Sequence, residues 1–281
     1  MGSGAMADSF KNGWLALAPF KNAWSHRQLV RRFVGREVVG RYRGSIGGLS
    51  WSLVQPMAML LVYTFVFSVV FKARWTAQNE IAGVSFAVVL FVGLIVQGIF
   101  AECIGRAPGL IVSHATFVKK VIFPIEILPV VAMGSALFHS LVSFVVLFFA
   151  MLIAGNAFHW TIILIPLVLA PFLLMTLGLS WFLAALGVFL RDIGQMIGLL
   201  VTALLFLSPV FYPLSAIPES YRIFLMLNPI TFPVEQARDV LIWGKMPSWS
   251  GLALYSVVSW AVAVLGFAWF QRIRKGFADV L

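Results

Sequence analysis

The side chains that could carry out chemistry in this sequence are few and stand far apart. Glu102, Glu126 and Asp192 each lie at the end of an apolar stretch, and none has a second carboxylate beside it to share the roles of general acid and general base. His139 is the only ionisable candidate inside an apolar stretch, where a histidine either bonds to a neighbouring helix or relays protons. These residues give little support to catalysis or to ion-coupled transport.

Sequence patterns for metal and nucleotide binding are also missing. His26, His114, His139 and His159 do not have the spacing of metal ligands. The single cysteine, Cys103, excludes a disulfide within the chain and a cysteine-rich metal site. No G-x-x-x-x-G-K-[ST] motif is present to cradle a phosphate. If the protein uses ATP, the nucleotide and its Mg²⁺ must therefore bind to a partner.

The composition is that of an integral membrane protein. Of 281 residues, 61% are hydrophobic and 11% are charged, with a mean hydropathy of +0.99. A soluble protein contains about 25% charged residues. The net charge of +10 could suggest nucleic-acid binding, but the basic residues cluster at the ends of apolar stretches, as the positive-inside rule requires. The opening MGSGA is typical of a tag, so Met6 is the expected natural start, and no cleavable signal peptide is expected.

The chain is organised around residues 25–56, where a basic amphipathic helix leads through a glycine-rich hinge into the first long apolar stretch. At helical spacing its apolar residues form one broad stripe, and its arginines gather on the opposite side. Glu37 lies four residues before Arg41, which favours an ion pair on the helix surface. The helix is too polar to span a bilayer, so we expect it to lie on the membrane with its stripe in the acyl boundary. The stripe consists of Leu29, Val30, Phe33, Val34, Val38 and Tyr42, and the opposite side of Arg32, Arg36 and Arg43.

Six apolar stretches predict six membrane-spanning helices. The stretch from Ile127 to Leu190 contains no Asp, Glu, Lys or Arg and is far longer than a single crossing of about 20 residues, so it must fold back on itself. Its turn is expected at Gly155 and Asn156. The predicted spans are 48–71, 82–104, 125–153, 161–189, 193–212 and 249–270.

The segment 213–247 is rich in proline yet too apolar for a free aqueous loop. It predicts two short amphipathic helices, 219–227 and 233–243, that re-enter the membrane from outside, and an ordinary capped loop on the outer surface is the alternative. Most basic residues fall on the side of the two termini, which places both termini in the cytoplasm. The outer side would hold only Lys72, Arg74, Arg222, Arg238 and Lys245. The sequence thus predicts an all-α polytopic membrane protein, with an N-terminal segment 1–46 and a membrane domain 47–281.

Four motifs carry a family resemblance. REVVGRYRGSIGGLSW precedes the first span, and GLIVSHATFVKKVIFPIEILPV forms the loop before the third. FLRDIGQMIGLLVTALLFLSPVFYPLSAIP covers the fifth span, and NPITFPVEQARDVLI follows it. In their order and spacing these motifs resemble the membrane subunit of ABC-2 type exporters, in particular the bacterial permeases that export O-antigen and related lipid-linked polysaccharides. The resemblance extends over nearly the whole chain from residue 25 onward.

The resemblance implies an ATP-driven transport subunit rather than an enzyme. It implies a homodimer in the bacterial inner membrane with two ATPase subunits at the cytoplasmic face, which would hold ATP and Mg²⁺, while this chain would carry no cofactor. The loop around 109–120 and the helix around 26–43 would contact the ATPase, although Lys119 and Lys120 could equally be positive-inside anchors. The residues implied in this coupling are Arg36, Glu37, Arg41, Arg43, His114, Phe117, Lys119 and Lys120.

The resemblance also implies a polysaccharide path, an external gate and a cytoplasmic turn. Aromatic side chains with little charge would let sugars slide, although an aromatic stripe at helical spacing also serves helix packing or lipid contact. Asp192 in the turn Arg191-Asp192 would either cap the fifth span or take part in transport. The candidates for the path are Trp51, Tyr63, Phe67 and Gln97. The candidates for the gate are Tyr212, Pro213, Pro218, Tyr221, Asn228 and Pro229.

Three other functions stay open on the sequence. An exporter of the same architecture could move capsule, teichoic acid or a drug. A membrane enzyme acting on a lipid-linked glycan would have to use Glu102, Glu126 or Asp192, which lack a paired carboxylate. A secondary transporter is disfavoured because no span carries an Asp, Glu, Lys or Arg near its middle.

Overall fold

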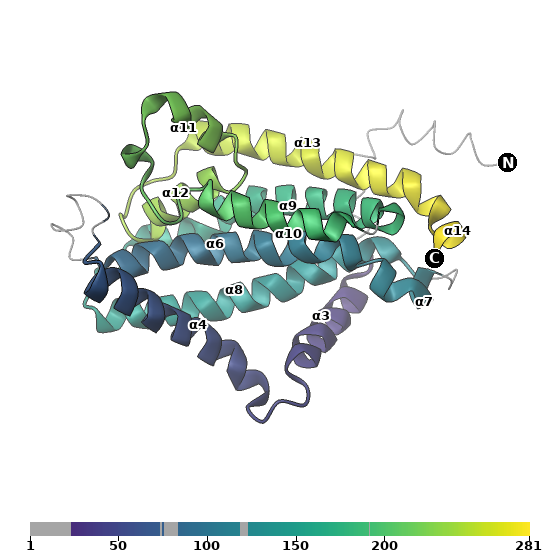
Figure 1. The fold of residues 1–281 in the computed structure, drawn as a ribbon, viewed down its shortest axis with the longest axis horizontal. Coiled ribbons are helices and arrows are strands. Elements are labelled where there is room, and N and C mark those ends of the chain that lie inside the picture. The colour runs from purple at the N-terminus through teal and green to yellow at the C-terminus, as the bar shows by residue number, and fades with distance from the viewer. Residues whose placement is uncertain (1–23, 74, 76–83, 119–122, 191) are drawn as a thin grey trace.

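Long helices packed side by side make up the protein (Figure 1). The computed structural model describes residues 24–73, 75, 84–118, 123–190 and 192–281, and no β-strand occurs among them. The longer helices are α3 (Arg27–Tyr42), α4 (Trp51–Tyr63), α6 (Phe86–Arg106), α8 (Leu128–Ile153), α9 (Ile165–Phe189), α10 (Ile193–Phe206) and α13 (Trp249–Ile273). The shorter α-helices are α7 (Ala115–Val118), α11 (Glu219–Met226), α12 (Thr231–Leu241) and α14 (Phe277–Val280).

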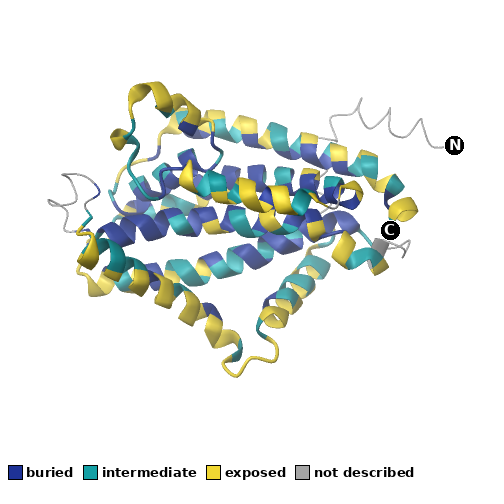
Figure 2. Ribbon diagram, viewed as in Figure 1, coloured by how far each residue is buried: buried dark blue, intermediate teal, exposed yellow. Residues whose placement is uncertain are grey.

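Helices α6, α8, α9, α10 and α13 run along the long axis of the molecule (Figure 1). We call the end that carries α7 and α14 the α7 end, and the opposite end, which carries α11 and α12, the α11 end. Figure 2 shows that buried residues concentrate on α6 and on the inner faces of its neighbours, whereas α4 and α11 are mostly exposed. The main apolar core therefore surrounds α6.

Helices α9 and α13 approach closely because each carries a glycine where they cross. A Cβ on Gly178 would lie 2.6 Å from the Cα of Ala263, and a Cβ on Gly266 would overlap the backbone of Gly178. Small residues let apolar helices approach within a membrane, where close packing rather than the hydrophobic effect holds helices together. This crossing joins the sixth predicted span to the centre of the bundle.

The structure confirms the positions of most predicted spans. The predicted turn between the third and fourth spans is confirmed at Gly155, whose φ of 69° favours glycine. Proline at position 56 is accommodated inside α4, as expected. Among the described residues, five helical stretches are long and apolar enough to cross a membrane, namely Gly48–Val70, Phe86–Gly109, Ile125–Ile153, Trp160–Phe189 and Trp249–Val280.

The fifth predicted span is shorter than expected. Helix α10 begins at Ile193 as predicted, but it ends at Phe206 rather than near residue 212. Its 14 residues extend about 21 Å, which is less than the hydrocarbon thickness of about 30 Å. The helix ends here because Pro209 has no backbone N–H and disfavours a helical conformation at Ser208. The count of six membrane-spanning helices stays a prediction.

Two short helices follow α10, as the sequence predicts. Helix α11 lies on the outside of the α11 end, and α12 packs against α6 and α9. Their re-entry into the membrane stays a prediction, as does the domain boundary at residue 46. The regular helical pattern between prolines was sufficient to locate both helices.

Helices α3 and α4 meet at an apex that stands away from the bundle (Figure 1). The apolar stripe of α3 faces α8, where Val34 packs against Gly134 and the ring of Tyr42 meets the ring of His139 edge-on at 6.1 Å. Part of the stripe therefore packs on protein, and its place in the acyl boundary stays a prediction. Gly134 has no side chain, so α3 can approach α8 closely, and Val38 is the one residue of the stripe that is buried.

Candidate functional site

Four charged side chains and one histidine meet where α3, α6 and α8 come together. The Glu102 carboxylate on α6 accepts a hydrogen bond from Arg41 Nη1 at 2.7 Å and lies 3.0 Å from Nδ1 of His139 on α8. Arg106, one turn further along α6, lies 3.6 Å from Glu102 and also pairs with Glu37 of α3. These five residues, which we call the Glu102 cluster, fasten α3 to two helices of the bundle.

The expected ion pair between Glu37 and Arg41 on the surface of α3 is wrong, because both side chains turn to α6. A surface pair within one helix stabilises it by only about 0.3–0.5 kcal/mol. A hydrogen bond to a charged group contributes about 1.5–3 kcal/mol, and Glu102, 16% exposed, is screened less by water than a surface carboxylate. Arg41 is 48% exposed, which reduces this gain. The bond between His139 and Glu102 confirms the interpretation that the histidine bonds to a neighbouring helix.

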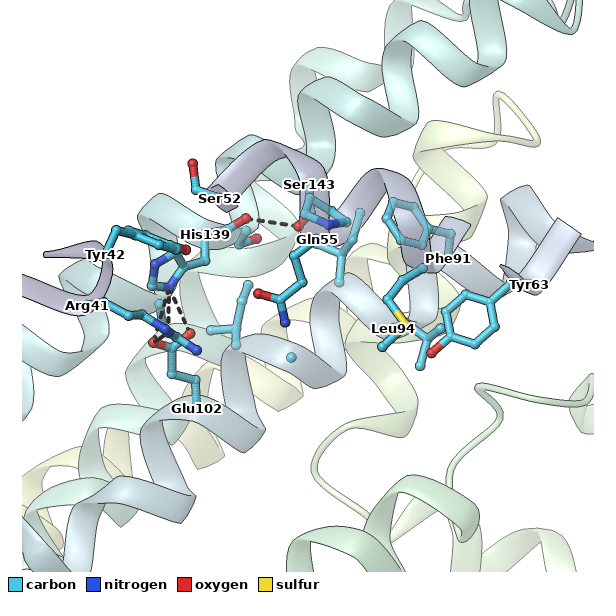
Figure 3. A pocket seen from close by; sticks show the side chains of 17 residues that line it. Arg41, Tyr42, Ser52, Gln55, Tyr63, Phe91, Leu94, Glu102, His139 and Ser143 are labelled. Carbon is cyan, nitrogen blue, oxygen red and sulfur yellow. Dashed lines mark hydrogen bonds and ion pairs between the residues drawn. The ribbon is translucent and has the colours of Figure 1, made fainter. Parts of the chain in front are cut away.

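A cavity of about 280 Å³ opens beside the Glu102 cluster, between α4 on one side and α6 and α8 on the other. Figure 3 shows Gln55 of α4 pointing into it, beside Arg41, Glu102 and His139 at one end and with Tyr63 at the other. We call this space the α4–α6 cavity. Its apolar wall includes Met59, Phe91, Leu94, Ile95 and Ile99. The cavity is therefore polar at one end and apolar at the other.

Two of the arginines expected to contact an ATPase are open to solvent. Arg36 and Arg43 are exposed, and the guanidinium of Arg36 lies 4.4 Å from the centre of the Phe33 ring on the same helix. Phe33 also contacts Phe123, with ring centres 5.5 Å apart, so α3 touches the chain that follows the predicted coupling loop. Glu37 and Arg41, by contrast, are engaged in the Glu102 cluster.

The rest of the predicted coupling loop is only partly described. His114 ends a 3₁₀ turn, Val112–His114, and its Nδ1 lies 2.8 Å from the carbonyl oxygen of Leu110. Phe117 falls within α7, directly after this turn. Lys119 and Lys120 lie outside the described residues. The coupling role of these residues stays a prediction.

The candidates for a polysaccharide path do not share one surface in the single chain. Trp51 is 50% exposed, whereas Tyr63 and Phe67 face α6, where Phe67 stacks on Phe86 with ring centres 5.3 Å apart. Gln97 is 3% exposed, and its amide donates to a backbone carbonyl of α10 at 3.4 Å. These contacts are of the kind that helix packing produces. The lining role of the four residues stays a prediction.

The candidates for an external gate surround the chain between α10 and α12. The Tyr212 hydroxyl donates to the carbonyl oxygen of Phe206 at 2.7 Å, and the Asn228 amide donates to two carbonyls at the end of α10. The carbonyl oxygen of Pro229 accepts from a tyrosine of α13 at 2.7 Å, while Tyr221 is 60% exposed. Pro213 and Pro218 precede the helical turn Leu214–Ala216 and helix α11. The bonds of Asn228 and Pro229 fix the chain that follows α11, and the gate role itself stays a prediction.

Sequence analysis missed the contacts of Arg238, which it treated as an ordinary charge on the outer side. The side chain is 1% exposed. Burial lowers the pKa of Arg238 to about 10, which leaves it charged at neutral pH. Glu235, three residues earlier on α12, was the available signal, because acid-first spacing predicts a pair. The partners of the Arg238 side chain are the carbonyl oxygens of Val89, Pro209 and Val210, the carboxylate of Glu235 and the ring of Trp75.

The other carboxylates considered for catalysis have structural surroundings. Glu126 lies 3.2 Å from Arg274, and its side chain is 9% exposed. Asp192 occupies the N-cap position before α10, as predicted. Its side chain makes no hydrogen bond to the helix, so the prediction that its carboxylate caps α10 is wrong. Arg191 lies outside the described residues. Within the described part of the chain, no three His, Cys, Asp or Glu side chains are grouped to hold a metal ion.

Sequence comparison establishes the family. The profile of the ABC-2 type transporter family matches residues 28–242, so the chain belongs to this family. The O-antigen export system permease protein RfbA of Myxococcus xanthus is 31% identical over 92% of this chain and 97% of its own length. A permease of the same name from Klebsiella pneumoniae is 21% identical over 86% and 90%. The polysialic acid transport protein KpsM of Escherichia coli is 24% identical over 84% and 90%.

Proposed function

We propose that this chain is the membrane-spanning permease subunit of an ATP-driven exporter of lipid-linked polysaccharide. The observation that carries the proposal is a match over nearly the full length of relatives named for O-antigen export. The relative named for polysialic acid transport supports the same class of cargo. A cargo of the O-antigen type is favoured over polysialic acid, because the Myxococcus xanthus permease is more similar to this chain than KpsM is and covers more of it.

The energy would come from two separate ATPase subunits bound at the α7 end. The sequence has no phosphate-binding loop of its own. Toward the α7 end, the part of α3 that carries Phe33 and the exposed Arg36 lies close to the chain that follows α7, through the contact of Phe33 with Phe123. A protein that docks on both would sense movement of α3 and, through the Glu102 cluster, of α6 and α8.

The α7 end is proposed to face the cytoplasm of a bacterial inner membrane. The arginines of α3 and the basic residues Arg272, Arg274 and Lys275 lie at this end, as the positive-inside rule requires. The subunit would act as a homodimer. Much of the apolar surface of α4 has no partner within the described part of the chain, and a second copy would cover some of it.

The proposal is tested by purifying the chain from its native membranes together with any ABC ATPase that binds it. The double variant Arg36→Glu with Arg43→Glu reverses two exposed charges, one on α3 and one at its C-terminal end, and Lys119→Glu with Lys120→Glu reverses two charges of the predicted coupling loop. We expect a complex of two permeases and two ATPase subunits for the natural chain, and loss of ATPase binding in at least one double variant. Lys245→Glu, at the α11 end, is the matched control and should keep the complex.

Export is measured separately, as lipid-linked polysaccharide that reaches the outer side of membrane vesicles when ATP is supplied. Export by the natural chain, lost in the variant that fails to bind the ATPase, supports the proposal. A chain that stays alone, or a complex that hydrolyses ATP but moves only another cargo, contradicts it.

A further inference from the structure

The α4–α6 cavity has the length of one leaflet of a bilayer. It is lined along α4 from Ser52 to Tyr63 and along α6 from Phe91 to Glu102. Eleven helical steps extend about 16 Å, and half of a hydrocarbon core of about 30 Å is about 15 Å. The polar end lies at the Glu102 cluster, and the apolar end lies one leaflet's depth away.

The polar end offers groups that suit a phosphate and its ester oxygens. Within the described chain, the polar contacts of Arg41 all use Nη1, which leaves other guanidinium donors for an anion. The Gln55 amide points into the cavity (Figure 3). The buried Nε2 of His139 has no hydrogen-bond partner among the residues described. The donors available to a phosphate are therefore the remaining guanidinium N–H groups of Arg41 and the Gln55 amide.

The α6 wall of the cavity offers room for a hydrocarbon chain. Between Phe86 and Ile104, Gly98 is the one residue of α6 that is exposed, and it faces this cavity. A Cβ placed on Gly98 would meet no atom within 4 Å. Leu94 and Glu102 lie one helical turn to either side, so the three residues form a single open stripe on an otherwise buried helix. An apolar gap of this size loses dispersion contacts unless something fills it.

We propose that the α4–α6 cavity holds one glycerophospholipid, with its phosphate near Arg41 and Gln55 and one acyl chain along Leu94 and Gly98. The neighbouring Met59 and Ile99 then contact the chain rather than empty space. The lipid ties α4 to α6 in addition to their side-chain contacts. This inference rests on the shape and polarity of the cavity and does not depend on which cargo the protein exports.

The test is native mass spectrometry of the full chain purified from membranes in mild detergent. The variant Gly98→Phe fills the middle of the cavity, and Gly105→Phe is the matched control, because it lies on the same helix, also has open space for a Cβ and does not line the cavity. We expect one phospholipid per chain on the natural protein and on Gly105→Phe. We expect at least a tenfold lower occupancy on Gly98→Phe.

A second measurement keeps the test valid if Gly98→Phe fails to fold. Delipidated chain is titrated with phosphatidylglycerol, and Gln55→Leu is compared with Gln195→Leu, a change at an exposed glutamine outside the cavity. The apparent Kd should rise about tenfold for Gln55→Leu, equivalent to about 1.4 kcal/mol, and stay unchanged for Gln195→Leu. Absence of bound phospholipid on the natural chain, equal occupancy in Gly98→Phe, an unchanged Kd in Gln55→Leu, or a polyprenyl phosphate in place of phospholipid overturns the proposal.

Discussion

Helices α4 and α6 belong to the first two apolar stretches of the chain, which have nearly the same length but opposite surroundings. The stretch Gly48–Val70 has 23 residues and Phe86–Gly109 has 24. In the most apolar part of each, 6% of the residues are buried in the first and 78% in the second. Apolar content therefore tells which segments enter a membrane, but it does not tell which of them pack inside the protein.

The two helices can differ in burial because their surroundings are a lipid bilayer and not water. In a bilayer an apolar side chain is equally satisfied by lipid and by protein, so packing depends on shape and on polar links. Helix α6 is contacted by α8, α9, α10 and α12, and it holds both the Glu102 cluster and the carbonyl of Val89 that binds Arg238. Helix α4 has only a narrow stripe on the bundle. We conclude that α6 is the fixed scaffold and α4 the helix that is free to meet lipid or a second chain.

The largest expected effect is at Arg238. Arg238→Met leaves Glu235 and three backbone carbonyls without their cation, which should lower the free energy of unfolding by about 3–5 kcal/mol. Arg222→Met is the control, because Arg222 is 36% exposed and its partner Glu219 is 90% exposed. That change should cost no more than about 0.5 kcal/mol. Equilibrium unfolding in mixed micelles measures both, and equal losses would show that α12 is not anchored through Arg238.

A pair of leucines tests the comparison directly. Leu90 on α6 is fully buried, whereas Leu61 on α4 is 70% exposed. Leu90→Ala should lower the free energy of unfolding by about 2–4 kcal/mol, because it leaves a cavity in the core. Leu61→Ala should change it by less than about 0.5 kcal/mol in the isolated chain. The same unfolding measurement applies, and similar losses at the two positions would remove the distinction between the helices.

Much of the fold could be predicted because helix ends carry local signals. Gly155 marks the turn between α8 and α9, and the proline-bounded pattern located α11 and α12. The early end of α10 was missed, although Pro209 carried its signal, because an apolar sequence continues past the last helical residue. Local rules locate segments, but apolar content alone does not show where a proline ends the helix within one.

The candidate site was less predictable because its contacts join residues distant in sequence. Glu102 and His139 were both singled out from the sequence, but nothing local shows that they meet at 3.0 Å. Glu37 and Arg41 have ideal spacing for each other and still pair across helices. The buried position of Arg238 depends on three carbonyls from two other segments. Tertiary geometry determines which of these side chains pair with each other.

A medium effect is expected at Glu102. Glu102→Gln removes the charge that holds Arg41 and His139, which should lower the free energy of unfolding by about 1–3 kcal/mol. Because Arg41 is exposed to solvent, we expect a loss in the lower half of this range. Amide hydrogen exchange in α3 should become faster, because this cluster fastens α3 to the bundle. Glu219→Gln, at a 90% exposed position, is the control and should leave exchange unchanged. Unchanged exchange in Glu102→Gln would mean that the apolar stripe alone holds α3.

The smallest expected effect concerns a direct polar link between the two stretches that were compared. The Ser68 hydroxyl, in the π-helical turn Thr64–Val70 that continues α4, lies 3.0 Å from the hydroxyl of Ser85. Ser85 also accepts from the backbone N–H of Ala87 and so caps α6. Ser68→Ala should cost about 0.5–1.5 kcal/mol, and Ser85→Ala should cost about 1 kcal/mol more because the cap is lost as well.

A double-mutant cycle separates the link from the cap. If the hydroxyls bond to each other, the double variant should lose less than the two single variants together, by about 0.5–1 kcal/mol. Simple additivity would mean that each serine acts alone. Helix α4 would then be held on α6 at this end only by aromatic contacts such as Phe67 on Phe86, and its freedom relative to the scaffold would be greater than the comparison implies.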